Sequence, residues 1–207
     1  MESSWLTHAK RLQAIASTGL HFCKDAHDRE RYREVAEIAH QMLAQLGNVP
    51  LERITELVSD FAQRYSTPMV EVRGALIEDH KILLVRETTD GLWALPGGFA
   101  DVGLSASENV IKEIHEEAGI EVAVRGLYSI RHKAKGPYKA DHRDFYKLYF
   151  LCDRQQRRAP MAGSEASEVG FFALDRLPPL SLGRTVERDI HEAFDFHQGK
   201  TARVQFD

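Results

Sequence analysis

Apolar residues recur every three or four positions through the first third of the chain, which is the spacing of amphipathic helices. We predict three helices over residues 1–66, with Gly47 and Pro50 between the last two. Their apolar stripes are Leu6, Ala9, Leu12 and Ile15; Tyr32, Val35, Ile38, Ala39, Met42 and Leu46; and Ile54, Leu57, Val58, Phe61 and Tyr65. Each stripe has to be covered by another helix or by a partner.

The pattern changes at Ser66-Thr67-Pro68, because proline disfavours helix in the residue before it. The apolar runs that follow suit strands, and the first two form a predicted hairpin around Glu78-Asp79-His80. The expected strands are residues 70–77, 82–85, 121–131, 144–152 and 169–174, and the expected helices are residues 105–118 and 184–196. The fold class is therefore α+β, with a helical domain over residues 1–66 and a second domain over residues 67–207.

Composition narrows the class of protein. Hydrophobic residues make up 43% of the 207 residues, which is enough for a packed core. The net charge of −4 disfavours a nucleic-acid-binding surface, which is usually basic. The two cysteines are far apart, and neither a signal peptide nor a membrane-spanning run is present, so we expect a cytoplasmic protein.

The stretch GGFADVGLSASENVIKEIHEEAG carries the candidate chemistry. Ser105 and Glu108 form an S-x-x-E capping box, so a helix is expected to start there. Glu113, Glu116 and Glu117 follow at i, i+3 and i+4, on one face of that helix. Repulsion between like charges and the helix dipole both oppose this arrangement, and a divalent cation would reverse both penalties. The alternative is a solvated acidic face without a ligand.

A glycine pair precedes this helix. Glycine lets the backbone approach an ion closely, so the Gly97 carbonyl is a candidate oxygen ligand beside the carboxylates. Mg²⁺ prefers such oxygen ligands and shares its coordination sphere with phosphate, and Mn²⁺ is a second candidate. Without the acidic helix, Gly97-Gly98 would indicate only a flexible turn.

The stretch resembles the Nudix hydrolase box, G-x5-E-x7-R-E-U-x-E-E-x-G-U, where U is a bulky aliphatic residue. The matching residues are Gly98, Glu113, Ile114, Glu116, Glu117, Gly119 and Ile120. Leu104 and Lys112 depart from the box, at two positions where the family has a Glu–Arg pair that braces the loop against the helix. The resemblance extends over residues 69–195 and implies an α/β/α sandwich in which Gly97, Glu113, Glu116 and Glu117 bind metal.

The ADVGLS variant and the helical N-terminal segment resemble a narrower group of bacterial Nudix enzymes. These enzymes hydrolyse nucleoside diphosphates linked to another group, such as ADP-ribose or CDP-choline, into a nucleoside monophosphate and a second phosphate. The family often draws a general base from outside the box. Glu168 is the first candidate for this base and Glu165 is the alternative.

Basic and aromatic residues supply candidate substrate contacts. Residues 131–143 are basic, contain Gly136 and Pro137, and lie between two predicted strands. Tyr138 and His142 in this loop are candidates for stacking on a base. Arg73 and Arg86, which flank the first hairpin, are weaker candidates for phosphate contact. The alternative is an ordinary solvated loop.

These observations predict a Mg²⁺-dependent pyrophosphohydrolase acting on a small nucleotide, assembled as a homodimer through its apolar N-terminal helices. Two other classes stay open. One is a Nudix enzyme that processes RNA or capped 5′ ends, and the other is a non-catalytic ADP-ribose-binding sensor. The presence of Glu113, Glu116 and Glu117 favours catalysis over sensing.

Overall fold

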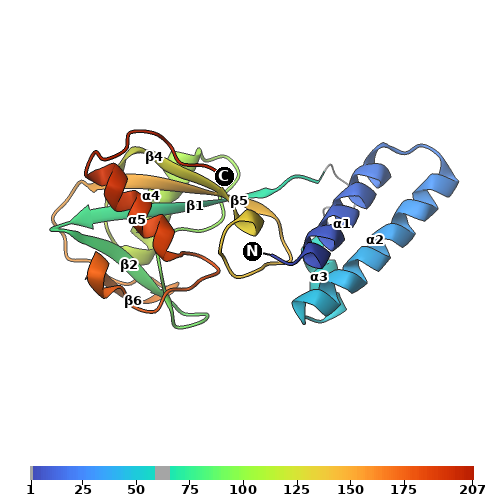
Figure 1. Cartoon of the computed structure of the whole chain (residues 1–207), viewed down its shortest axis with the longest axis horizontal. Coiled ribbons are helices and arrows are strands. Elements are labelled where there is room, and N and C mark those ends of the chain that lie inside the picture. Colours follow the sequence, from blue (N-terminus) through green and yellow to red (C-terminus); the bar gives the residue numbers. More distant parts are fainter. Residues whose placement is uncertain (1, 59–65) are drawn as a thin grey trace. The chain divides into compact units, whose positions relative to one another are not determined.

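The computed structural model describes residues 2–58 and 66–207, and the chain forms two compact units (Figure 1). The first unit comprises Met1–Met69 together with Ala140–Asp144, and the second comprises Val70–Lys139 and Phe145–Asp207. The sequence pattern gives no sign that Ala140–Asp144 belongs to the helical unit. Within the described residues, no helix has the length and apolar character needed to cross a bilayer.

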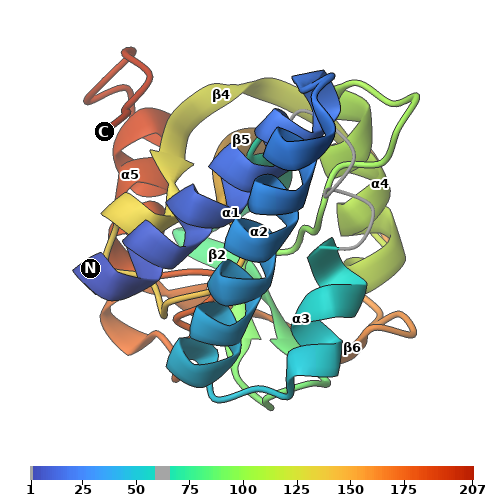
Figure 2. The same cartoon turned by 90° about the vertical axis from the view of Figure 1, so that its right-hand side faces the viewer.

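The first unit contains helices α1 (Ser4–Phe22), α2 (Ala26–Gly47) and α3 (Leu51–Val58). Ser3 and Asp25 cap the first two by accepting backbone hydrogen bonds through their side chains. α1 and α2 form a helical hairpin (Figure 2), and Gly19 allows the close approach, since a Cβ there would lie 2.4 Å from the Tyr32 ring. The core of this unit is Leu6, Ala9, Leu43, Ala44 and Ile54.

The predicted helical stripes are only partly buried. Ala39 and Ile54 are in the interior, whereas Leu12, Ile15, Ile38 and Leu46 are between 37% and 48% exposed. Phe61 and Tyr65 lie outside the described residues. The first unit therefore carries apolar surface beyond what its own core uses.

The second unit is built on a mixed sheet in the order β3-β2-β1-β5-β4, with β6 pairing β2. The strands are β1 (Met69–Glu78), β2 (Lys81–Glu87), β3 (Trp93–Ala94), β4 (Val122–His132), β5 (Phe145–Arg154) and β6 (Ala166–Ala173). β1 and β2 form the predicted hairpin, and its turn residues Asp79 and His80 both have positive φ, as a two-residue type I′ connection requires.

Helices α4 (Ala106–Ala118) and α5 (Glu187–His197) cover opposite faces of this sheet. Alternate residues of each strand face one helix or the other. Val72, Leu83 and Phe150 pack in the cluster that contains α4, whereas Ala75, Leu84 and Tyr149 pack in the cluster that contains α5. The predicted α+β fold, an α/β/α sandwich preceded by helices, is confirmed.

Two predicted starts differ from the structure by three residues, and the other predicted bounds by two at most. α5 begins at Glu187 and not at residue 184, because Ser181 accepts the Arg184 and Thr185 amides and holds this segment as a turn. β6 begins at Ala166 and not at residue 169, because β2 pairs it as far as Glu87. The second difference matters for the candidate base.

Candidate active site

The Gly97-Gly98 turn is fixed by β1. The Gly74 amide donates to the Pro96 carbonyl at 2.9 Å, and the Val72 amide donates to the Gly98 carbonyl at 2.8 Å. Gly97 has φ +144°, and a Cβ there would lie 2.1 Å from the Val72 carbonyl oxygen. Only glycine fits this position.

Helix α4 presents its three glutamates to different environments. The capping box of Ser105 and Glu108 fixes the start of the helix, and Gly119 ends it in the left-handed conformation, as predicted. Glu117 is buried, Glu113 is half-buried and Glu116 is exposed. The shared helix face therefore runs from the interior to solvent.

The two less exposed carboxylates touch the glycine turn. Glu117 Oε2 accepts the Gly97 amide at 2.8 Å, and a Cβ on Gly98 would lie 2.9 Å from Glu113 Oε1. Within the described residues we find no hydrogen-bond donor to the Gly97 carbonyl, which is the predicted oxygen ligand. Glu116 instead pairs with Lys112 at 2.9 Å.

Burial changes the acidity of both carboxyls. It raises the pKa of Glu117 to about 7, with further contributions from Glu87 and Glu113, against the opposing effects of Arg73 and the Gly97 amide. Burial also raises the pKa of Glu113, against the opposing charges of Lys112 and Arg73, and the charges of Glu116 and Glu165 add to the increase. Both ionised side chains are therefore short of compensating positive charge.

These residues fit a divalent cation. Their donors are hard carboxylate oxygens in a desolvated position, where a cation would offset the electrostatic penalty. Among the residues that the structure describes, no three acidic, histidine or cysteine side chains already converge on one point. Glu116 has to leave Lys112 before it can join Glu113 and Glu117 at an ion.

The loop before β6 packs on the end of α4. The Met161 amide donates to the Ala118 carbonyl at 2.9 Å and the Gly163 amide donates to the Glu117 carbonyl at 3.1 Å. A Cβ on Gly163 would lie 1.7 Å from the Glu116 carbonyl oxygen, so glycine is needed for this contact. The loop also carries Glu165, whose negative charge contributes to raising the pKa of Glu113.

Comparisons with known proteins show the family of this chain. A model of the NUDIX domain matches residues 67–194, and a model described as a UDP-X-like, N-terminal oligomerisation domain matches residues 3–58. The chain belongs to the Nudix family. The sequence-based prediction of a Nudix pyrophosphatase is thus confirmed.

Two relatives match this Nudix protein over its whole length, and a third matches about two thirds of it. A Bacillus subtilis protein provisionally named ADP-ribose pyrophosphatase YjhB is 39% identical over 209 residues, covering 100% of this chain and 99% of that protein. A crystal structure of a UDP-X diphosphatase is 34% identical, with TM-score 0.64 and full coverage of both chains. An ADP-ribose pyrophosphatase from Streptococcus suis is 36% identical, with TM-score 0.62, covering 68% of this chain and 100% of that one.

The structure separates the two candidate bases of this Nudix site. Glu168 lies within β6 and pairs with Arg86 of β2, at 2.5 Å between Oε1 and Nη1. Because β6 starts earlier than predicted, Glu168 is engaged in a cross-strand ion pair. Glu165 precedes the strand, is exposed, and acts on Glu113. The ion pair of Glu168 favours the alternative, Glu165, and the choice between the two stays a prediction.

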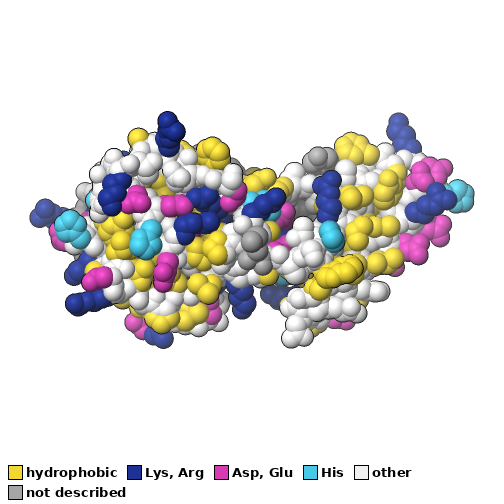
Figure 3. Space-filling model, in the orientation of Figure 1, with side chains coloured by type: hydrophobic (Ala, Val, Ile, Leu, Met, Phe, Trp, Pro, Cys, Tyr) yellow, Lys and Arg dark blue, Asp and Glu magenta, His cyan; other side chains and the backbone are white. Residues whose placement is uncertain are grey.

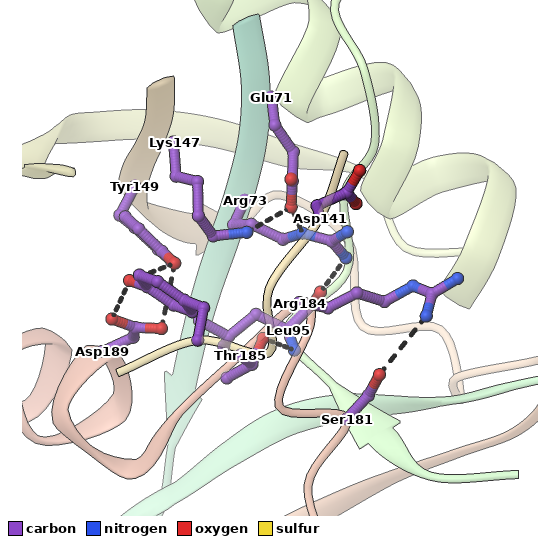
Figure 4. A network of polar contacts seen from close by, with 12 residues as sticks. Glu71, Arg73, Leu95, Asp141, Lys147, Tyr149, Ser181, Arg184, Thr185 and Asp189 are labelled. Carbon is purple, nitrogen blue, oxygen red and sulfur yellow. Dashed lines mark hydrogen bonds and ion pairs between the residues drawn. The ribbon is translucent and has the colours of Figure 1, made fainter. Parts of the chain in front are cut away.

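Two predicted substrate contacts are interior residues. Arg73 is 4% exposed and donates to Glu71 at 2.6 Å and to the Leu95 carbonyl at 2.8 Å (Figure 4). Tyr138 is 5% exposed, and its hydroxyl donates to Asp189 at 2.7 Å. Burial leaves neither side chain free for a substrate, so both assignments are corrected to structural roles.

The other two predicted contacts are also engaged within the protein. Arg86 is partly exposed and holds the turn after β2 through the Gly91 carbonyl at 2.8 Å, in addition to its pair with Glu168. His142 lies in Ala140–Asp144, the segment of the first unit, with Nδ1 3.6 Å from Asp141. Among the described residues, Arg86 makes no hydrogen bond or ion pair with Glu113 or Glu117, and the predicted role of His142 stays a prediction.

Sequence reasoning missed a buried polar network under the turn (Figure 4). Lys147 is fully buried and donates a hydrogen bond to Glu71, which also accepts a hydrogen bond from Arg73. Burial lowers the pKa of Lys147 to about 8, whereas Lys147 and Arg73 together outweigh burial and lower the pKa of Glu71. Lys147 lies between the core residues Phe145 and Tyr149 and shares their face of β5. This alternation in the sequence was the sign that Lys147 is buried.

The raised pKa of Glu117 predicts how metal-free protein responds to pH. A carboxyl with a raised folded-state pKa stabilises the fold at low pH, and this stability is lost as pH rises from the ordinary value of 4.5 through about 7. In EDTA at pH 8 we expect Glu117→Gln to be more stable than the parent protein, by up to about 3 kcal/mol from burial of Glu117.

Urea unfolding at pH 5 and pH 8 measures this difference, which should shrink at pH 5. Excess Mg²⁺ should favour the parent protein, because only an ionised carboxylate holds the ion well. Glu34→Gln, on an exposed position of α2, is the control and should show no such pH dependence. A Glu117→Gln protein that is less stable than the parent at pH 8 in EDTA would contradict the assigned electrostatics.

Proposed function

We propose that this protein hydrolyses the pyrophosphate bond of a nucleoside diphosphate linked to a second group, with ADP-ribose as the first candidate substrate. The observation that carries the proposal is the contact of Glu113 and Glu117 with the Gly97-Gly98 turn, which leaves two desolvated carboxylates in need of a divalent cation. The full-length similarity to a protein provisionally named ADP-ribose pyrophosphatase supports the substrate class.

Glu113, Glu116 and Glu117, with the Gly97 carbonyl, would hold Mg²⁺ or Mn²⁺. When bound, such an ion neutralises charge on a diphosphate and makes a water molecule more acidic. Glu165 supplies the base that accepts the proton of the attacking water, since its loop is fixed to the end of α4. The products are a nucleoside monophosphate and the phosphate of the second group.

A cavity of the second unit, lined in part by the start of α5, suits the less polar part of such a substrate. It has a volume of about 590 Å³ and is lined by Pro137, Leu177, Pro178, Pro179, Leu180, Leu182, Val186, Glu187 and Arg188. Pro179 accepts the Trp93 amide at 3.0 Å, and Trp93 begins the strand that leads to Gly97. Apolar walls with a guanidinium suit the nucleoside or its partner group.

We propose that the N-terminal unit makes the protein a homodimer. Trp5, Leu12, Ile15 and Phe22 are exposed and recur at intervals of seven and three along α1, so they form one stripe. Hydrophobic side chains are visible over α1 and α2 in Figure 3. The match to an N-terminal oligomerisation domain supports a second copy as the partner of this surface.

A substrate screen tests the proposed activity. Purified protein with Mg²⁺ is expected to release monophosphate from ADP-ribose faster than from CDP-choline, a UDP-sugar, NADH, diadenosine polyphosphates or capped RNA. Activity should be lost in EDTA and in Glu117→Gln, which removes a metal ligand. Absence of turnover with the whole panel would refute the proposal, and preferred cleavage of capped RNA would support the alternative RNA-processing class.

Exchange of the two candidate bases tests the mechanism. Glu165→Gln is expected to lower kcat about 100-fold or more, which is the usual contribution of a positioned base. Glu168→Gln removes only a partly exposed ion pair with Arg86 and should leave kcat within a few-fold of the parent. Steady-state kinetics with the best substrate of the screen measure both. A larger loss in Glu168→Gln would reverse the assignment.

A charge in the α1 stripe tests the dimer. Ile15→Glu places a carboxylate on the exposed stripe without touching the core of the first unit. We expect light scattering after gel filtration to give a monomer mass for this variant and a dimer mass for the parent. Glu37→Gln on exposed α2 is the control and should remain dimeric. A monomeric parent protein would refute the proposal.

A further inference from the structure

The segment between the glycine turn and α4 lacks the Glu–Arg pair of the Nudix box, yet it is closely held. Its first part is fixed to β1, because the Ala100 amide donates to the Val70 carbonyl at 2.9 Å. Beyond this point Val102 is fully exposed and Leu104 is 40% exposed, so these apolar side chains contribute little anchoring. Polar contacts with α4 have to hold the remainder.

Asn109 makes most of these contacts. Its side chain is fully buried, and its Oδ1 accepts the Asp101 amide at 2.8 Å. Its Nδ2 lies 3.1 Å from the Ser105 carbonyl oxygen and 3.3 Å from that of Leu104. A buried amide that uses both its donor and its acceptor is costly to lose, because removing it leaves backbone groups unsatisfied.

Lys112 adds a charged contact to the same loop residue. Its Nζ lies 3.1 Å from Asp101 Oδ2 and 2.9 Å from Glu116 Oε2. Both carboxylates raise the pKa of Lys112 and keep it charged. Lys112 can thus release Glu116 to a cation and still retain Asp101.

These contacts follow the geometry of the helix. Asn109, Glu113 and Glu117 are spaced by four residues and form one line along α4. Along this line Glu117 contacts Gly97, Glu113 lies against Gly98, and Asn109 binds Asp101. Successive helical turns therefore hold successive positions of the loop, and Asn109 is the first of the three.

We propose that Asp101, Asn109 and Lys112 replace the missing Glu–Arg pair and position the Gly97-Gly98 turn against the carboxylates. Asn109 is a positioning residue, since it acts through the loop and through the helix line it shares with Glu113. This inference rests on the proposed metal site and names the residues that set its geometry.

The central variant is Asn109→Ala. We expect it to weaken Mn²⁺ binding, measured by electron paramagnetic resonance without substrate, by about 10-fold, as is typical when an outer-shell partner is removed. Hydrogen exchange of amides 99–105 should become faster. The control is Lys200→Met, which removes an exposed ion pair with Asp195 of the same length, 3.1 Å, as the pair between Lys112 and Asp101. It should change neither measurement.

A rescue experiment distinguishes a positioning role of Asn109 from a general loss of stability in the Asn109→Ala variant. Leu104→Glu with Lys112→Arg installs the pair found in the Nudix box, and in the Asn109→Ala background it should restore most of the Mn²⁺ affinity. In the parent background the same pair should change affinity less than twofold. Equal gains in both backgrounds, or Mn²⁺ binding by Asn109→Ala equal to that of the parent, would overturn the proposal.

A folding defect would not leave the question open. If Asn109→Ala fails to fold, Asp101→Asn neutralises the loop end of the Lys112 pair and keeps its size, and it should weaken Mn²⁺ binding and speed exchange to a smaller extent. No change in either measurement overturns the proposal. Both measurements are independent of substrate. A failure of the activity screen can therefore be distinguished from a failure of the proposed role of Asp101, Asn109 and Lys112.

Discussion

The active-site geometry depends on two carboxylates held out of water against a backbone turn that only glycine can form. Glu117 reaches Gly97 and Glu113 lies against Gly98. This contact is unfavourable by itself, because burial opposes ionisation of both groups. The sheet, the caps of α4 and the loop from Met161 to Gly163 all keep it in place. The fold thus holds two carboxylates without enough positive charge around them, and a bound cation would supply that charge.

Part of this arrangement could be read directly from residue types. The capping box at Ser105, the stop at Gly119 and the hairpin at Asp79-His80 are set by local interactions within a few residues. The spacing of the glutamates placed them on one face for the same reason. Local rules have physical causes that need no knowledge of distant contacts, and so these elements were predictable.

Other parts depend on pairing that the sequence does not encode locally. Glu168 and Glu165 differ by three positions, and only the extension of β6 along β2 shows that the first is paired with Arg86. Arg73 and Tyr138 were predicted as substrate contacts, but Arg73 is paired with Glu71 and Tyr138 with Asp189 inside the protein. Glu168 and Tyr138 are placed by partners on β2 and α5, and Glu71, the partner of Arg73 on β1, is itself bound by Lys147 of β5.

The segment Ala140–Asp144 has a consequence for how this chain can be divided. It lies in sequence between β4 and β5 but belongs to the helical unit, where Lys10 of α1 lies 3.3 Å from Asp144 and donates to the Arg143 carbonyl at 3.2 Å. The chain therefore enters the helical unit twice. A single cut near Met69 would not yield two self-contained pieces, since it would strip a strand-connecting loop of its supports. A domain exchange at that junction alone would therefore leave Ala140–Asp144 with the second unit and remove the helices that this segment belongs with.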